Sequence, residues 1–181
     1  MPERKFYWIA LVGAAGLVST GQNQCQTPVA PFNVSGVYDG MWHGQIVNEA
    51  GEAVSDVVDC PLQLTFTHDP NLPFPGNLNG TAVAVIDFSC IELPGNIEPA
   101  EASTVNMLFV LGADGKLISG AGGFGIGTGA FLALNGEGAD ADADGSMDDY
   151  SGEWDYLFVL ALPGIPPFHV EGTFEAGRVI E

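Results

Sequence analysis

Two segments, residues 60–66 and 82–90, constrain the fold most strongly, because their apolar side chains and cysteines fall on matching faces. In CPLQLTF and AVAVIDFSC, apolar residues recur at every second position. This period is typical of a strand with one buried face. An antiparallel pair centred on Pro75 matches both faces in one register. It places Cys60 opposite Cys90, Leu62 opposite Phe88, Leu64 opposite Ile86 and Phe66 opposite Ala84.

The same register predicts a disulfide between Cys60 and Cys90. The sequence has three cysteines, so one internal disulfide leaves one thiol, Cys25, over. Closing a loop of about 30 residues stabilises a fold by roughly 3–4 kcal/mol. The alternative is that Cys60 and Cys90 are two free buried thiols. Leu17-Val18-Ser19 resembles a lipid-attachment box, but Thr20 follows where a cysteine is needed. Gln22-Asn23-Gln24, which precede Cys25, do not fit the box, so lipidation of Cys25 is disfavoured.

The N-terminus has the order of regions that is typical of a secretory signal peptide. Two cations in residues 1–5 precede an uninterrupted apolar run over 6–18, and small residues follow at 19–21. We expect a signal peptide over 1–21 and a linker over 22–33. The protein would then be extracytoplasmic: secreted, periplasmic or part of the cell envelope. A retained N-terminal anchor is the alternative, although the apolar run is shorter than the ~20 residues that span a bilayer.

The rest of the chain predicts an all-β fold, an antiparallel up-and-down barrel of about eight strands in a single domain over 34–181. Period-two segments recur between turn residues, and Asp114-Gly115 between apolar runs indicates a hairpin. A β-sandwich is the alternative. The predicted strands are 34–47, 60–66, 82–90, 104–111, 117–124, 129–137, 151–162 and 168–176.

Aromatic residues on the inward faces of these strands are candidates for a ligand pocket or for plain core packing. They are Tyr38, Trp42, Phe88, Phe109, Trp154, Tyr156, Phe158 and Phe174. Gly40-Met41-Trp42 resembles the opening of lipocalins, and GADGKLISG at 112–120 is similar to a hairpin of avidin-like barrels. This resemblance implies an eight-stranded barrel that binds a small ligand in its mouth. A barrel of eight strands can also be filled by its own side chains.

The charge excludes some classes of partner. The sequence has 23 Asp and Glu against 4 Lys and Arg, a net charge of −19. Cleavage after Gly21 removes Glu3, Arg4 and Lys5, which leaves 22 acids and 2 bases and a charge of −20. Two cationic side chains are too few to neutralise the phosphates of a nucleic acid or of an anionic membrane. We therefore expect neither nucleic-acid binding nor adsorption to an anionic membrane surface. The 46% of hydrophobic residues is enough for a folded core.

The sharpest chemical feature is a cluster of eight acids in residues 137–155. Within it, residues 140–145 match D-x-D-x-D-G, which resembles the first half of an EF-hand calcium loop. The candidate ligands are Asp140, Asp142, Asp144, the carbonyl of Ser146 and Asp148. Position 12 of the motif is Ser151 instead of Glu, and Asp149 or Glu153 would have to replace it. We expect binding no tighter than about 10⁻⁴–10⁻³ M. The alternative is a solvated acidic hairpin.

No catalytic motif stands out. The glycines of G-x-G-x-x-G at 120–125 precede a Gly-rich stretch and not a helix, and none of His43, His68 and His169 has a metal-ligand spacing. The sequence therefore predicts an exported, non-enzymatic barrel that binds a small or apolar ligand. One alternative is a structural or interaction module of the cell envelope stabilised by weak calcium binding. A second is an enzyme with an unrecognised site. An open apolar cavity of about 300 Å³ or more would favour the ligand-binding protein.

Overall fold

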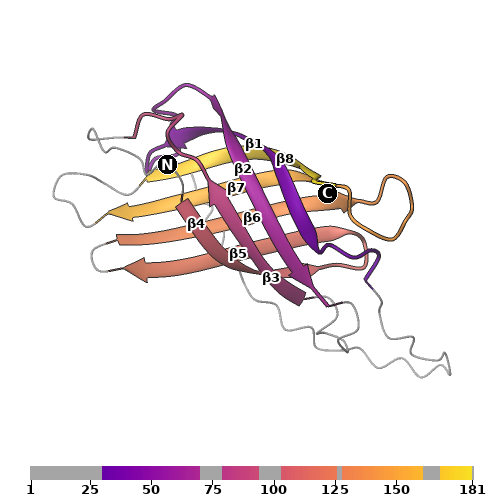
Figure 1. The fold of residues 1–181 in the computed structure, drawn as a ribbon. Helices are drawn as coiled ribbons and strands as arrows, with labels where there is room; N and C mark the ends of the chain where they lie inside the picture. Colours follow the sequence, from indigo (N-terminus) through magenta and orange to yellow (C-terminus); the bar gives the residue numbers. More distant parts are fainter. Residues whose placement is uncertain (1–29, 70–78, 94–102, 126–127, 161–167, 181) are drawn as a thin grey trace, which may run out of the picture.

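The computed structural model shows an all-β, closed antiparallel barrel of eight strands (Figure 1). It describes residues 30–69, 79–93, 103–125, 128–160 and 168–180, and for 79, 121–125, 128–130 and 158–160 it describes the backbone alone. Within these ranges, no helix is long and apolar enough to cross a membrane. The strands are β1 (Gly36–Val47), β2 (Val58–His68), β3 (Asn79–Ile86), β4 (Ser103–Leu111), β5 (Lys116–Gly125), β6 (Thr128–Ala139), β7 (Asp149–Leu160) and β8 (Phe168–Arg178).

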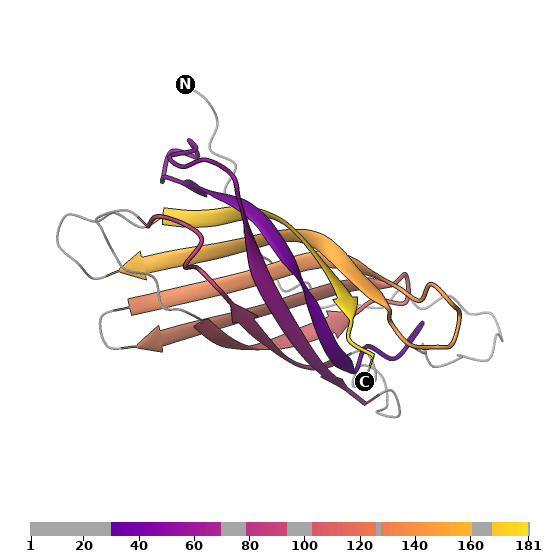
Figure 2. The same ribbon diagram turned by 45° about the horizontal axis from the view of Figure 1, so that its top comes forward.

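The predicted up-and-down barrel is confirmed, because each strand pairs with the next in the chain and β8 pairs with β1. The closing ladder runs from Tyr38 opposite Arg178 to Val47 opposite His169. The shortest ladder joins β4 to β5, from Leu108 opposite Gly120 to Leu111 opposite Leu117. In Figures 1 and 2, β2 and β3 run steeply across β5, β6 and β7, so the two walls of the barrel cross at a large angle.

The predicted hairpin at Asp114-Gly115 joins β4 to β5. The amide of Gly112 donates to the carbonyl of Lys116 (2.7 Å). The amide of Gly115 donates to the carbonyl of Gly112 (3.1 Å). Gly115 has a φ of 84°, which glycine adopts without steric cost. The predicted signal peptide, Cys25 and the loop around Pro75 lie outside the described residues. Ala30 and Phe32, at the end of the predicted linker, pack against the core of the barrel.

The Cys60–Cys90 disulfide is present, with the two Cα atoms 5.9 Å apart. The predicted strand register is wrong by two residues, since Leu62 lies opposite Ile86, Leu64 opposite Ala84 and Phe66 opposite Ala82. The reason is that β3 ends at Ile86 and the chain turns, with the amide of Ile91 donating to the carbonyl of Phe88 (3.2 Å). Cys90 reaches Cys60 from this turn and not from the ladder. A shift of two residues keeps every side chain on its predicted face.

The β1–β8 seam, where the barrel closes, depends on glycines that face inward. Gly44 lies opposite Gly172 in the ladder. A Cβ added to Gly172 would overlap the carbonyl of His43 and lie 2.7 Å from the Cα of Gly44. The two backbones therefore approach more closely here than any side chain permits, and glycine in a strand commonly marks such an approach.

Candidate functional site

Residues 140–148, which include four aspartates, form the connection between β6 and β7 at one end of the barrel. Ala139 and Asp149, which flank the connection, lie opposite each other in the ladder. The flanking elements are therefore strands, as expected, and not the helices of an EF-hand. The chain follows a tight path, with Ala143 at a φ of 61° and Gly145 at 87°. Ala143 is the only residue other than glycine with positive φ in the part of the chain that the structure describes, and this conformation is strained for a residue with a Cβ.

Carboxylate–amide hydrogen bonds hold the backbone of the loop in this path. The amide of Gly145 donates to Asp140 (2.9 Å), and the amide of Asp144 donates to both Asp140 and Asp142 (3.1 Å each). The amide of Ala141 donates to Asp148 (2.7 Å). Aspartate side chains commonly close such turns on backbone amides two residues further on. The aspartates therefore shape the loop as well as charge it.

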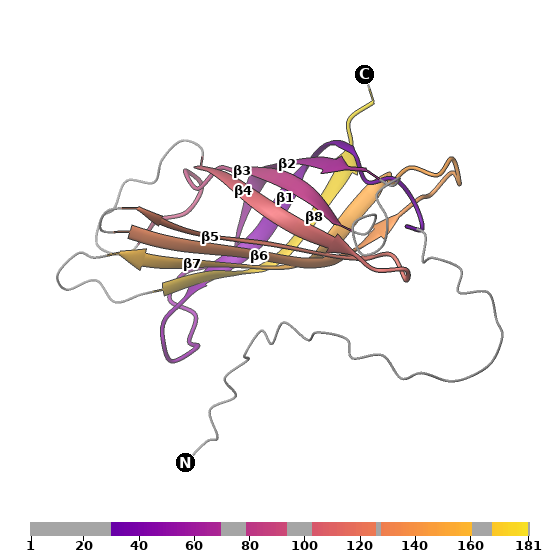
Figure 3. The ribbon, with the colours of Figure 1, turned by 90° about the horizontal axis from the view of Figure 1, so that it is seen from below.

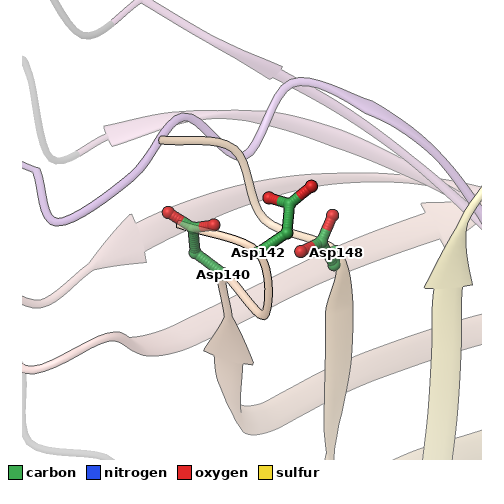
Figure 4. Close-up of side chains that lie close together, drawn as sticks. All are labelled: Asp140, Asp142 and Asp148. Atoms are coloured by element: carbon green, nitrogen blue, oxygen red, sulfur yellow. The ribbon is translucent and has the colours of Figure 1, made fainter. Parts of the chain in front are cut away.

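Three of the five predicted ligands come together. Each of Asp140, Asp142 and Asp148 offers a carboxylate oxygen, and these oxygens all lie within 4.8 Å of one another. Figure 4 shows their side chains projecting close together from the loop. Asp144 is outside this group, and its carboxylate accepts from the amide of Ser146 (2.7 Å). Roles for Asp144 and for the Ser146 carbonyl stay predictions, and neither Asp149 nor Glu153 belongs to the group.

The electrostatics of the three carboxylates are unfavourable without a cation. Two unit charges about 4 Å apart repel by about 1 kcal/mol even in bulk water. Of the two cationic side chains in the described ranges, Lys116 pairs with Asp114 (4.0 Å), and Arg178 donates from its guanidinium to the carbonyl of Ser35 (3.2 Å). Hard divalent cations such as Ca²⁺ and Mg²⁺ take oxygen ligands of this kind, so the three carboxylates could hold one of them.

The loop also ties together the two strands that close the barrel. The amide of Asn33, just before β1, donates to the carbonyl of Gly145 (2.8 Å), and its carbonyl accepts from the amide of Met147 (2.8 Å). At the end of β8, the amide of Arg178 donates to the carbonyl of Asp148 (2.7 Å). The side chain of Met147 is fully buried. A change in the loop therefore reaches the β1–β8 seam.

Tyr38 connects this seam to the loop from inside the barrel. Its hydroxyl is within hydrogen-bond distance of the carbonyls of Val34 (3.1 Å) and Met147 (3.0 Å). The pKa of Tyr38 is raised to about 12, mainly because the side chain is buried. The charge of Arg178 opposes this rise and the charge of Asp148 adds to it. The hydroxyl therefore stays protonated in the folded protein at any physiological pH.

The candidate pocket aromatics fill the interior of the barrel. Tyr38, Trp42, Trp154 and Tyr156 are buried, and the side chain of Phe158 lies outside the described part. Rings from different walls touch: Trp42 and Trp154 have centroids 4.4 Å apart, and Phe88 lies 5.0 Å from Tyr156. Phe66 on β2 meets Tyr150 on β7 at 5.7 Å. At these levels the protein's own side chains occupy the lumen, and burial raises the pKa of Tyr156 and of Tyr150.

A concave surface lies on the outside of the barrel, across β1, β8, β7 and β6. It has a volume of about 600 Å³ and is lined by polar side chains that include Glu153, Asp155 and Glu171. The two outward histidines pair with carboxylates, His43 with Asp59 (2.7 Å) and His169 with Asp155 (3.0 Å). Both are partly exposed, as surface histidines are expected to be, and His68 faces inward against Phe109.

No protein-family model matches the chain, and a comparison with curated proteins finds no match either. The chain forms a closed barrel of eight strands, and the resemblance to lipocalins and avidin-like barrels stays a prediction. The architecture by itself does not identify a family, because many unrelated functions share such barrels. Function therefore has to be inferred from the geometry of the chain.

Proposed function

We propose that this protein is an exported, non-enzymatic module of the cell envelope, with a structural or interaction role, whose barrel is stabilised by weak calcium binding at the β6–β7 loop. The observation that carries the proposal is the convergence of the carboxylates of Asp140, Asp142 and Asp148. The disulfide between Cys60 and Cys90 supports an oxidising, extracytoplasmic compartment.

The loop conformation supports the calcium part of the proposal. The predicted motif needs glycine at its sixth position for a sharp turn, and Gly145 occupies that position with positive φ. Strain at Ala143 is retained in a loop whose carboxylates stay close together, and such strain is more common at ligand sites than elsewhere. Because the loop bonds to both Asn33 and Arg178, a bound cation would strengthen the end of the barrel where β1 meets β8.

The packing of side chains in the lumen favours a structural or interaction module, and not a protein that carries apolar ligands inside the barrel. Rings from segments that are not paired in the sheet meet at 4.4–5.7 Å, and two hollows formed by described residues open on the outside of the barrel. One observation favours small-ligand binding as a second candidate. The indole nitrogens of Trp42 and Trp154 are buried and have no hydrogen-bond acceptor among the residues that the structure describes. Such donors are rarely left unpaired, and native mass spectrometry of the purified protein would detect a co-purified guest.

Calorimetric titration of the mature chain with calcium tests the main proposal. We expect a dissociation constant of about 10⁻⁴–10⁻³ M. Asp142→Asn should weaken binding at least about tenfold, because it removes a charge and keeps the oxygen that accepts from Asp144. Glu171→Gln removes one charge from an exposed position of β8, outside the loop, and is the matched control.

Thermal unfolding gives a second readout. For a dissociation constant of about 1 mM, about 10 mM calcium should stabilise the wild-type fold by roughly 1.4 kcal/mol. The Asp142→Asn variant, with binding about tenfold weaker, should keep at most about 0.4 kcal/mol of this gain, and Glu171→Gln should keep all of it. Absence of both heat and stabilisation at millimolar calcium, or equal loss in the two variants, would refute a site in this loop.

A further inference from the structure

Acidic residues are unevenly distributed over the outside of the barrel. Strands β3, β4 and β5 contain no Asp or Glu, although the whole chain has 23. The outward positions of the other five strands hold eight: Asp39, Asp59, Glu137, Asp149, Glu153, Asp155, Glu171 and Glu175. One side of the barrel therefore repels anions much less than the rest of the surface does.

The same side presents apolar side chains to solvent. Leu108 is 71% exposed, Val110 54% and Ile118 55%. Val110 lies directly opposite Ile118 in the β4–β5 ladder, and Leu108 lies opposite Gly120, which has no side chain to cover it. A hollow of about 550 Å³ beside Leu108 is also lined by Thr81, Val83, Asn106 and Gly120. Clusters of exposed apolar groups rimmed by polar ones commonly mark interaction sites.

We propose that this acid-free face, the outward side of β3, β4 and β5, is where two copies of the chain associate in a symmetric dimer. Figure 3 shows β3 and β4 side by side on one side of the barrel, and β5 follows β4 in the sheet. The proposal does not depend on calcium binding, because the β6–β7 loop contributes no residue to this face.

Charge selects a second copy as the occupant. Each copy has a net charge of −19, so two copies that meet through β1, β7 or β8 place carboxylates against carboxylates. Meeting through the acid-free face instead buries Leu108, Val110 and Ile118 and keeps the acidic sides of both copies apart. A cationic partner would be attracted to the opposite, acidic side of the barrel. A twofold interface needs one self-complementary patch, and the apolar cluster of Leu108, Val110 and Ile118 fulfils that requirement. Lys116, the one charged residue in the sequence of β3, β4 and β5, lies at the start of β5 and pairs with Asp114.

The area of the acid-free face limits how strongly two copies can associate. Neighbouring strands are about 4.8 Å apart and outward residues about 6.8 Å apart, so about ten outward positions cover roughly 330 Å² of projected area. A standard interface buries about 800 Å² on each partner. The dimer is therefore weak and depends on protein concentration, at the low end of specific interfaces.

Sedimentation velocity of the mature chain, from micromolar to millimolar concentration in the presence of EDTA, tests the proposal. We expect a dimer whose fraction rises with concentration. It should also rise as salt increases from about 0.15 M to about 1 M, because the Debye length falls from about 8 Å to about 3 Å and the two acidic copies repel less.

Two variants and a matched control locate the interface. Leu108→Asp and Ile118→Asp should each raise the dimer dissociation constant at least about tenfold, since every dimer carries the change twice. Val54→Asp adds the same charge at an equally exposed valine (55%) in the β1–β2 connection and should leave the constant within about twofold. Near-ultraviolet circular dichroism of the buried Trp42 checks that each variant is folded.

Three results would overturn the proposal. The first is a wild-type chain that stays monomeric at millimolar concentration. The second is a dimer that survives both Leu108→Asp and Ile118→Asp in folded protein. The third is an equal loss of dimer in Val54→Asp, since added charge and not the acid-free face would then decide association.

Discussion

Replacing Gly172 by alanine tests whether the close approach of β1 and β8 holds the barrel closed. The new Cβ would overlap the carbonyl of His43 and lie 2.7 Å from the Cα of Gly44. Carbon atoms that are not bonded pack at about 3.5–4.0 Å, so the strands must separate locally by about 1 Å. Both obstacles are backbone atoms, so no side-chain rotation can relieve the overlap.

The cost follows from the hydrogen bonds that such a separation breaks. A gap of about 1 Å stretches backbone hydrogen bonds from about 2.9 Å to about 3.9 Å, beyond their effective range. Losing about two of them at about 1–1.5 kcal/mol each gives a destabilisation of roughly 2–3 kcal/mol. For a chain of this size we expect the midpoint of thermal unfolding to fall by about 4–12 °C.

The matched control is Gly120→Ala, in the centre of β5. A Cβ at Gly120 would meet only the carbonyl of Leu132, at 3.4 Å, which is ordinary contact. Alanine there also reduces the conformational freedom of the unfolded chain, so stability should be unchanged or rise by up to about 1 kcal/mol. Thermal and urea unfolding can be followed by tryptophan fluorescence, because Trp42 and Trp154 are buried. If Gly172→Ala were as stable as Gly120→Ala, the close approach of the two backbones could not be the reason for glycine at position 172.

Two further predictions concern the disulfide and the buried tyrosine. Replacing Cys60 and Cys90 together by alanine should lower the free energy of unfolding by roughly 3–4 kcal/mol, and reductant should then have no further effect on the melting curve. The raised pKa of Tyr38, about 12 against 10.0 for the free side chain, means that its contribution to stability is complete below pH 10 and is lost as pH rises toward 12. Alkaline unfolding curves should show this loss, and it should be smaller in Tyr38→Phe, which keeps only the part due to the other buried tyrosines, Tyr150 and Tyr156; identical pH dependence in the two proteins would contradict the assignment.

Much of the fold was predictable because period-two alternation specifies which face of a strand is buried. Tyr38, Trp42, Trp154 and Tyr156 point inward as the pattern requires. The register of β2 and β3 was not predictable in the same way. Slips of two residues leave both faces unchanged, so matching faces cannot distinguish them. The missed signal is Asp87, whose carboxylate accepts from the amide of Ser89 (2.8 Å) and marks a turn before Cys90.

The candidate site was predictable only as far as its contacts are local. The spacing of Asp140 and Asp142 placed them in one turn, and their carboxylates do lie together with that of Asp148. The bonds from this loop to Asn33 and Arg178 join residues far apart in the sequence, where no local pattern records them. Whether aromatic rings fill the lumen depends on how the walls cross, as for Phe66 and Tyr150, and no single strand encodes that geometry.

The pairing of β1 with β8 also determines when the protein can become compact. Seven of the eight strand pairings join consecutive strands, but the last one joins segments more than a hundred residues apart. Such pairing carries a large loop-closure entropy and is slow compared with hairpin formation. Until β8 has emerged, β1 has a free edge able to pair with other chains. A chain of this topology is therefore vulnerable until its final strand is in place. The bonds from the β6–β7 loop to Asn33, before β1, and to Arg178, at the end of β8, complete the closure.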